Sequence, residues 1–225
     1  GGSAMNVLVI GASRGLGHEF VRQYRADGAA VVATARDDAG LAALSALGAR
    51  ALRLDVTRLD STAGLAWQLD GDAFDVAVLV AGVYGPRQGP FDAPTAEAFD
   101  QVMHTNVLGP MRVIPQFVES LAPGARLAVL SSRMGAIGPR TQTGGWLYRA
   151  SKAALNSVLK DTALALGDRA VCAAFHPGWV QTDMGGASAD LTPERSVRDL
   201  RQAIARLQPA DSGGFFDHDG TPIPW

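Results

Sequence analysis

The chain of 225 residues has 47% apolar residues and a formal net charge of -2, which suits one α/β domain with its own core. The small negative charge, without blocks of like charge, gives no reason to expect nucleic acid or an anionic membrane as a partner. No apolar run approaches ~20 residues, no signal-peptide pattern is present, and Cys172 is the only cysteine, so we expect a cytoplasmic protein without a disulfide.

Residues 1–4 precede Met5 and resemble an expression scar, so one domain is predicted over residues 5–225. From there, apolar segments alternate with segments of helical periodicity. Strands are predicted at residues 6–10, 29–35, 51–54, 74–80, 126–130 and 170–175, with a seventh near 213–216. Helices are predicted at residues 16–24, 41–47, 59–69, 95–121, 146–166 and 193–207. Because most strands are apolar throughout, the pattern indicates a parallel sheet that helices cover on both faces.

Two long irregular segments, residues 132–145 and 176–190, each follow a predicted strand. Ligands of open α/β sheets bind at the carboxyl ends of the strands, so these segments are the first candidates for substrate contacts. Several aromatic and methionine residues in or beside such loops are interpreted either as the lining of an apolar pocket or as ordinary core residues. They are Tyr84, Met134, Trp146, Trp179 and Met184.

Residues 11–17 (GASRGLG) join the first predicted strand to the first predicted helix. Gly11 allows a tight turn, Gly15 lets the backbone approach a pyrophosphate, and Gly17 lets the helix pack closely on the sheet. The N-terminus of the helix then offers N–H groups and a positive dipole to phosphates. The strand–turn–helix context favours dinucleotide binding over the alternative, a plain structural turn.

Tyr148 and Lys152 are four residues apart in a predicted helix, so they share one face of it. A phenol with a pKa of about 10 is a poor base near neutral pH. A nearby ammonium group favours the phenolate and brings the phenol into range as a general acid or base. The pair therefore predicts acid–base catalysis; the alternative is a half-buried tyrosine followed by a surface lysine.

Together with further motifs in a fixed order, these features resemble the short-chain dehydrogenase/reductase family. The motifs are Asp55-Val56 after the third strand, Ala81-Gly82 after the fourth, Asn106 in the long helix, Ser131-Ser132 after the fifth, residues 148–152 (YRASK), and Pro177-Gly178 with Thr182 after the sixth. The segments SSRMGAIG, TGGWLYRASKAALN, HPGWVQTDMGG and IPW are similar to the C-factor-like carbonyl reductase branch. The resemblance covers the whole chain and implies a single-domain, Rossmann-like, doubly wound parallel sheet of strand order 3-2-1-4-5-6-7.

The resemblance implies a catalytic set of Asn106, Ser132, Tyr148 and Lys152. Ser132, or alternatively its neighbour Ser131, would hold the substrate carbonyl oxygen, which Tyr148 would protonate. Lys152 would lower the pKa of Tyr148 and hold the nicotinamide ribose, and Asn106 would bind a water molecule. The residues implied at the cofactor are Gly11, Ser13, Arg14, Gly15, Leu16, Gly17, Arg36, Asp55, Val56, Ala81, Gly82, Tyr148, Lys152, Pro177, Gly178, Val180 and Thr182.

The residue at the end of the second predicted strand bears on the choice of cofactor. Relatives that prefer NAD place an acidic residue there, which bonds the ribose 2′-hydroxyl and repels a 2′-phosphate. This chain has Ala35, followed by Arg36, with Arg14 in the glycine loop as a second cation. Guanidinium groups bind phosphate well, whereas Asp37 and Asp38 act against it. NADP(H) is therefore expected rather than NAD(H).

We expect an NADPH-dependent oxidoreductase that transfers hydride between the cofactor and a small carbonyl or alcohol substrate. The alternative is an NADP(H)-binding sensor or signalling protein with little turnover. Members of the family pair through the helices predicted here at residues 95–121 and 146–166, so a homodimer or homotetramer is expected, with Val113, Phe117, Leu155 and Leu159 as candidate contacts. No metal site is expected, because Cys172 and the histidines lack ligand spacing. The chain departs from the family pattern at Val80, where an asparagine that stabilises the sheet is usual.

Overall fold

The structure is a computed structural model that describes residues 4–80, 82–181, 186 and 189–225. Ala81 and Thr182, expected at the cofactor, and Met184, a candidate pocket residue, lie outside the described residues. Within the described part of the chain, no helix combines the length and the apolar composition needed to cross a membrane.

The described residues form one parallel sheet of seven strands in the order β3-β2-β1-β4-β5-β6-β7. The strands are β1 (Asn6–Ile10), β2 (Ala30–Ala35), β3 (Arg50–Arg53), β4 (Phe74–Leu79), β5 (Leu121–Leu130), β6 (Ala170–His176) and β7 (Gly214–Asp217). This confirms the predicted doubly wound sheet and its seventh strand. The order reverses between β1 and β4, which is where such sheets bind their ligands.

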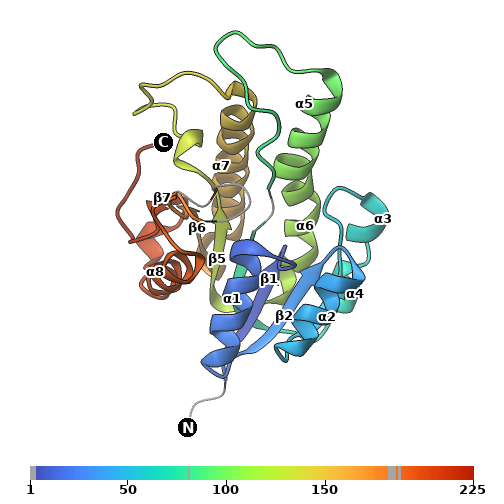
Figure 1. The fold of residues 1–225 in the computed structure, drawn as a ribbon. Helices are drawn as coiled ribbons and strands as arrows, with labels where there is room; N and C mark the ends of the chain where they lie inside the picture. The colour runs from blue at the N-terminus through green and yellow to red at the C-terminus, as the bar shows by residue number, and fades with distance from the viewer. Residues whose placement is uncertain (1–3, 81, 182–185, 187–188) are drawn as a thin grey trace.

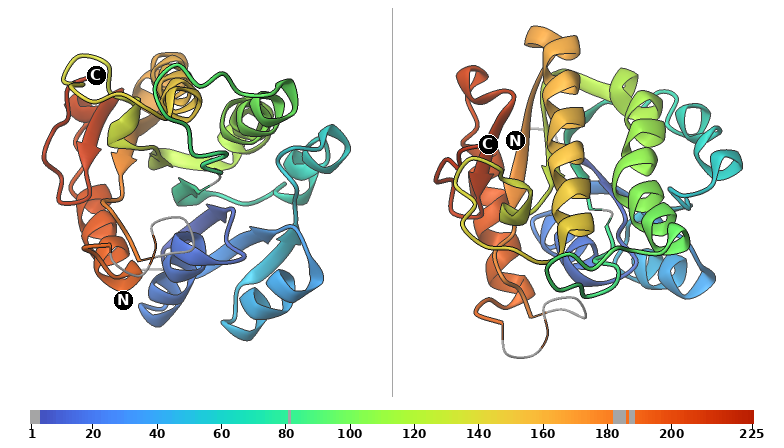
Figure 2. Two further views of the ribbon diagram at one scale, coloured as in Figure 1. Left: turned by 45° about the horizontal axis from the view of Figure 1, so that its top comes forward. Right: turned by 90° about the horizontal axis from the view of Figure 1, so that it is seen from above.

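Helices cover both faces of the sheet, as expected (Figure 2, left). They are α1 (Gly15–Ala26), α2 (Asp38–Ala46), α3 (Leu59–Thr62), α4 (Leu65–Gln68), α5 (Ala96–Met103), α6 (Gly109–Phe117), α7 (Trp146–Leu166) and α8 (Pro193–Ala205). Along β1, Val7 and Val9 belong to the core cluster under α1, α2 and α8, whereas Leu8 and Ile10 belong to the cluster under α4, α6 and α7. A central strand buried on both faces is apolar at every position, which explains the continuous apolar run.

The prediction of one continuous helix at residues 95–121 is wrong, because the helix is interrupted in the structure. After α5 the chain makes a wider π-helical turn, His104–Leu108, before α6 begins, and Val118–Ser120 closes as a 3₁₀ turn before β5. Pro110 explains the interruption, since it has no N–H to donate to the carbonyl of Asn106 four residues earlier, and its ring would press on that carbonyl in a regular α-helix.

Two further predictions need correction. Residues 59–69 form two short helices, α3 and α4, rather than one, and Gly64 lies between them. The apolar residues that were candidates for subunit contacts, Val113, Phe117, Leu155 and Leu159, are at most 1% exposed and belong to the core on the sheet. Other residues would have to make any contact between subunits.

Candidate active site

The catalytic candidates come from three elements that meet at the carboxyl edge of the sheet, towards the top of Figure 1. Ser132 follows β5, Tyr148 and Lys152 lie in the first two turns of α7, and Asn106 lies in the π-helical turn between α5 and α6. All four side chains are buried, between 0% and 7% exposed. The structure therefore brings together residues that are up to 46 positions apart in the sequence.

The two serines after β5 face different partners. The Ser131 hydroxyl donates a hydrogen bond of 2.6 Å to Oδ1 of Asn156 on α7, away from the tyrosine. Ser132 lies beside Tyr148, where its side chain acts to lower the pKa of the phenol, and its Oγ accepts the backbone N–H of Met134 at 3.1 Å. This geometry favours Ser132 over Ser131 as the residue that acts together with Tyr148.

Lys152 reaches the same place from one turn further along α7. Its Nζ lies 5.8 Å from the centroid of the Tyr148 ring and 3.5 Å from the carbonyl oxygen of Leu130. A Cβ atom added at Gly82 would lie 3.1 Å from Nζ of Lys152 and 3.5 Å from Oδ1 of Asn106. The backbone after β4, the lysine and the asparagine therefore converge on one point.

The Asn106 side chain links the segments that meet at this point. Its Oδ1 accepts the N–H of Val83 at 2.8 Å, and its Nδ2 donates to the carbonyl of Val83 at 2.9 Å and to Oγ of Ser151 at 3.0 Å. The side chain thus ties the loop after β4 to α7. Pro110, four residues on, is the sequence signal for the π-helical turn at Asn106, and the sequence reading missed it.

Burial sets the protonation of both titratable groups. It raises the pKa of Tyr148 to about 12, although the Ser132 side chain acts in the opposite direction. Burial lowers the pKa of Lys152 to about 8. In the chain without cofactor, loss of hydration dominates the pKa of the tyrosine, and the lowering expected with NADP⁺ bound stays a prediction. At neutral pH the phenol keeps its proton and the lysine is still largely an ammonium.

Tyr84, from the loop after β4, covers Tyr148. The rings of Tyr84 and Tyr148 stack with centroids 4.5 Å apart and an interplanar angle of 23°. A Cβ added at Gly145 would lie 3.3 Å from the Tyr84 hydroxyl and 3.5 Å from Cε of Met134. Trp146 and Trp179 are 41% and 53% exposed. Tyr84 and Met134 thus lie at the site, as the pocket interpretation expected.

The glycine loop forms the turn that the sequence predicted. A Cβ at Gly17 would lie 2.0 Å from the carbonyl oxygen of Gly11, so only glycine lets α1 approach the turn this closely. Gly15 has a φ of +59°, and a Cβ there would meet open space. Helix α1 begins at this glycine without a side-chain cap or an acidic residue in its first turn. Its first N–H groups therefore suit an anion.

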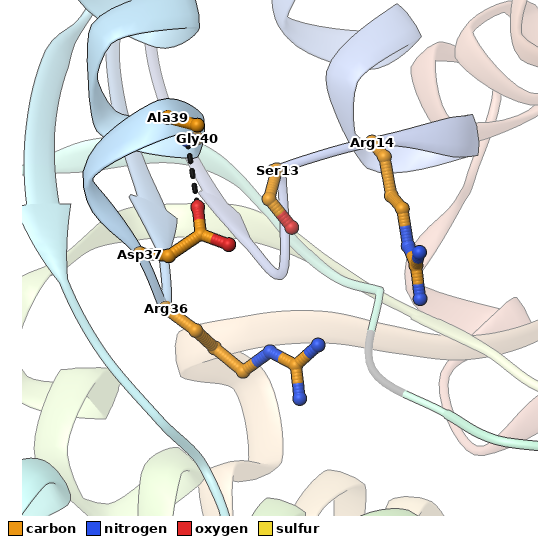
Figure 3. Close-up of a pocket in the computed structure, with 6 residues that line it drawn as sticks. All are labelled: Ser13, Arg14, Arg36, Asp37, Ala39 and Gly40. Atoms are coloured by element: carbon orange, nitrogen blue, oxygen red, sulfur yellow. Dashed lines mark hydrogen bonds between the residues drawn. The ribbon is translucent and has the colours of Figure 1, made fainter.

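A cavity of about 230 Å³ opens beside the glycine loop. Figure 3 shows that Arg14 and Arg36 extend to the same side of it, with Ser13 between them. Oδ1 of Asp37 caps α2 by accepting the N–H of Gly40 at 2.8 Å, and Asp38 pairs with Arg53. The two carboxylates that acted against phosphate binding in the sequence thus have other partners.

The remaining cofactor candidates border this region. Oδ1 of Asp55 accepts hydrogen bonds from the N–H and the hydroxyl of Thr57, at 2.9 and 2.6 Å. Burial acts to raise the pKa of the carboxyl, but these hydrogen bonds hold it below its usual range. Val56 packs against Gly109 at the start of α6.

After β6, the carbonyl of Pro177 accepts the hydroxyl of Ser196 at 2.6 Å, and the Val180 side chain is buried. Contact of Val180 with a ligand would therefore use its backbone. At the departure from the family pattern, Val80 donates its N–H to the carbonyl of Ile10 at 2.8 Å, so the ladder continues without the asparagine.

Comparisons with known proteins agree with this geometry. A family model described as short chain dehydrogenase matches residues 5–192. C-signal of Myxococcus xanthus is 41% identical over 154 residues, which cover 67% of this chain and 92% of that protein. The 1-hydroxy-2-glutathionyl-2-methyl-3-butene dehydrogenase of Rhodococcus sp. (strain AD45) is 34% identical over 228 residues, covering 97% of this chain and 99% of that protein. The solved structure of a carbonyl reductase from Pseudomonas aeruginosa PAO1 in complex with NADP has a TM-score of 0.87 at 32% identity, covering 99% of this chain and 100% of that one. This chain belongs to the short-chain dehydrogenase family of oxidoreductases.

Proposed function

We propose that this protein is an NADPH-dependent reductase that converts a small carbonyl compound into an alcohol, with Tyr148 as the proton donor. The observation that carries the proposal is a buried Tyr148 that has Ser132 beside it and Nζ of Lys152 5.8 Å from its ring centroid. Burial raises the pKa of this phenol to about 12. A phenol that keeps its proton at neutral pH suits the donor in a reduction.

The described residues fit NADPH. Arg14 and Arg36 border the cavity beside the glycine loop, where a 2′-phosphate would find two guanidinium groups. The uncapped N-terminus of α1 would take the pyrophosphate, and Asp55 would take the adenine amine. In support, the P. aeruginosa carbonyl reductase is complexed with NADP, and a carbonyl reductase from chicken fatty liver with 29% identity and a TM-score of 0.86 is NADPH bound.

Each side chain of the site would have a separate role in the reduction. Bound NADPH supplies the hydride that the carbonyl carbon accepts. Ser132 and Tyr148 would hold the carbonyl oxygen by hydrogen bonds, and the Tyr148 hydroxyl would give that oxygen its proton. The ammonium of Lys152, 5.8 Å from the ring centroid, would stabilise the phenolate that remains until it regains a proton. Asn106 would hold the loop after β4 in place against α7 through its hydrogen bonds to Val83 and Ser151.

The direct test is NADPH oxidation by the purified protein against a panel of aldehydes, ketones and quinones, followed by the loss of nicotinamide absorbance. We expect turnover with members of the panel, and faster turnover with NADPH than with NADH. The panel includes a glutathione conjugate of an alcohol, assayed as oxidation with NADP⁺, because a relative at 34% identity bears that activity in its name.

A second candidate function is NADP(H)-dependent signalling without turnover, which the relation to C-signal favours. Binding of NADPH in calorimetry, together with no reduction anywhere in the carbonyl panel, would support this candidate over the reductase. The buried arrangement of Ser132, Tyr148 and Lys152 supports the reductase, since cofactor binding alone has no use for a phenol paired with a serine.

A further inference from the structure

Three segments, two of them consecutive in the chain, lie beside Tyr148, and we refer to them together as the entrance. They are the loop between β4 and α5, the loop that precedes α7, and the first turn of α7. The N–H of Gly145 donates to the carbonyl of Gln88 at 3.0 Å, and Nε1 of Trp146 donates to the carbonyl of Asp92 at 3.0 Å. In Figure 1 the green loop accordingly runs past the N-terminal end of α7.

Most of the charged residues at this entrance are arginines. The guanidinium carbon of Arg87 lies 5.6 Å from the centroid of the Tyr84 ring, and that ring is itself stacked on Tyr148 at 4.5 Å. Arg149 follows Tyr148 directly in the chain and donates from Nε to the carbonyl of Gly144 at 2.8 Å. A cation therefore lies about one aromatic ring away from the catalytic phenol.

Arg140 is the third member of this group. Its Nε donates to the carbonyl of Gln142 at 3.0 Å, and its charge acts on Arg149. Burial of Arg149, followed by repulsion from Arg140, lowers the pKa of the Arg149 guanidinium, and Tyr84 acts in the opposite direction. Two like charges are thus held near each other by bonds to neutral carbonyl groups.

Among the residues that the structure describes, no carboxylate lies within ion-pair distance of these three cations. Asp92 is the only acidic residue in the three segments, and within the described part of the chain Arg87, Arg140 and Arg149 form no ion pair within 4.0 Å. Arginines elsewhere on the surface do form such pairs, for example Arg50 with Asp72 at 3.1 Å. Uncompensated arginines next to a reaction site attract anions and bind carboxylates through two parallel hydrogen bonds.

We propose that Arg87, Arg140 and Arg149 form an anion subsite at the entrance, and that the preferred substrate is a carbonyl compound that carries a carboxylate. The inference rests on the proposed reductase activity, and it adds the substrate class: an anionic aldehyde or ketone rather than a neutral one.

The test compares 4-formylbenzoate with its methyl ester, which differs in charge but keeps the aldehyde and the ring. We expect the wild-type protein to favour the acid in kcat/KM by about tenfold or more, as for one or two charge-assisted hydrogen bonds. Arg87→Gln and Arg149→Gln should each lower this ratio at least about fivefold, since each removes one of the cations. Arg206→Gln, an exposed arginine at the end of α8, is the matched control and should leave the ratio unchanged.

A binding measurement separates this inference from the reductase itself. Calorimetry of benzoate and of benzamide with the NADPH-loaded protein reports the subsite without any turnover. Binding of benzoate that Arg87→Gln weakens, together with no reduction of either aldehyde, would keep the subsite and reject the reductase. Equal use of acid and ester by the wild type, or an equal effect of Arg206→Gln, would overturn the subsite while the reductase stands.

Discussion

At the scale of single residues, burial places Tyr148 and Lys152 in complementary states. It raises the pKa of the phenol to about 12 and lowers the pKa of the ammonium to about 8. Each shift favours the neutral form of its group, because both side chains have lost most of their water. The phenol therefore stays protonated over the whole neutral range, and the lysine is the group that titrates near physiological pH.

The first prediction follows from the lysine. Its ammonium form is present below a pH of about 8 and is lost above it, so carbonyl reduction should slow as the pH rises through that value. The check is the pH profile of kcat/KM at saturating NADPH. Lys152→Met should lack this descending limb, whereas a wild-type rate that increases steadily from pH 7 to ~10 would contradict the assignment.

The second prediction concerns the proton donor. Tyr148→Phe removes one hydroxyl and keeps the ring that stacks on Tyr84, so the fold should survive. Turnover should fall by at least ~10²-fold, the usual contribution of a positioned acid, and the NADPH dissociation constant should change little. Tyr24→Phe on α1 is the matched control, since that tyrosine is buried beside Arg201 and should retain activity. Full turnover by Tyr148→Phe would reject the mechanism.

The third prediction concerns cofactor choice. Arg36→Gln removes a cation from the cavity beside the glycine loop, so NADPH should bind about tenfold more weakly, as for one lost charge-assisted contact. NADH, which has no 2′-phosphate, should bind as before. Calorimetric titration with both cofactors measures the difference, and an equal loss for NADH would show that Arg36 does not contact the phosphate.

At the scale of elements, the break between α5 and α6 positions the site. The π-helical turn at His104–Leu108 presents Asn106 to the loop after β4, where its side chain makes three hydrogen bonds. A continuous α-helix would have one residue fewer in that turn, so the asparagine would point in another direction. The turn is thus part of the site rather than an irregularity of the helix.

The fourth prediction tests this turn. Pro110→Ala supplies the N–H that a regular α-helix would donate to the carbonyl of Asn106, so the turn can tighten and displace the asparagine. We expect a loss of turnover of about tenfold or more from the displacement, with a melting temperature that is unchanged or higher. Pro115→Ala, also within α6, is the control. Unaltered activity in Pro110→Ala would show that the turn does not depend on the proline.

At the scale of the whole molecule, apolar side chains remain exposed on the layer formed by α5, α6 and α7. Phe99, Met111 and Leu164 are 47%, 51% and 72% exposed, while the apolar residues on the inner side of these helices are in the core. A helix layer with apolar residues on both sides needs a cover on its outer side. A second copy of the chain related by two-fold symmetry is the simplest cover.

The fifth prediction is therefore a homodimer that uses this layer. Light scattering at micromolar concentration should report twice the mass of one chain, and Leu164→Glu should shift the protein towards monomer. Trp67→Glu on α4, where the side chain is 84% exposed, is the control and should leave the dimer intact. A wild-type protein that is monomeric under these conditions would contradict the assembly.

The local sequence determined the sheet, its helices and the glycine loop, because these depend on apolar periodicity and on turn geometry within a few neighbouring residues. It also determined the pair Tyr148 and Lys152, whose spacing places them on one face of a helix. The order of the strands came from the resemblance to a family, and the structure confirmed it. Pro110 indicates a break in the helix, but the apolar periodicity of the segment predicts a continuous helix and gives no sign of the π-helical turn.

Only the tertiary structure decided the rest, because it depends on which side chains lose water and meet others far along the chain. Packing assigned Ser131 to Asn156 and Ser132 to Tyr148, a choice that adjacent serines leave open in the sequence. Burial raises the pKa of Tyr148 in the chain without cofactor, an effect that the spacing to Lys152 does not reveal. Asp37, which lines the cavity beside the glycine loop, uses one carboxylate oxygen to cap α2, and two stretches of chain that are distant in the sequence bring arginines near Tyr84. Residue types and spacing record none of these long-range contacts.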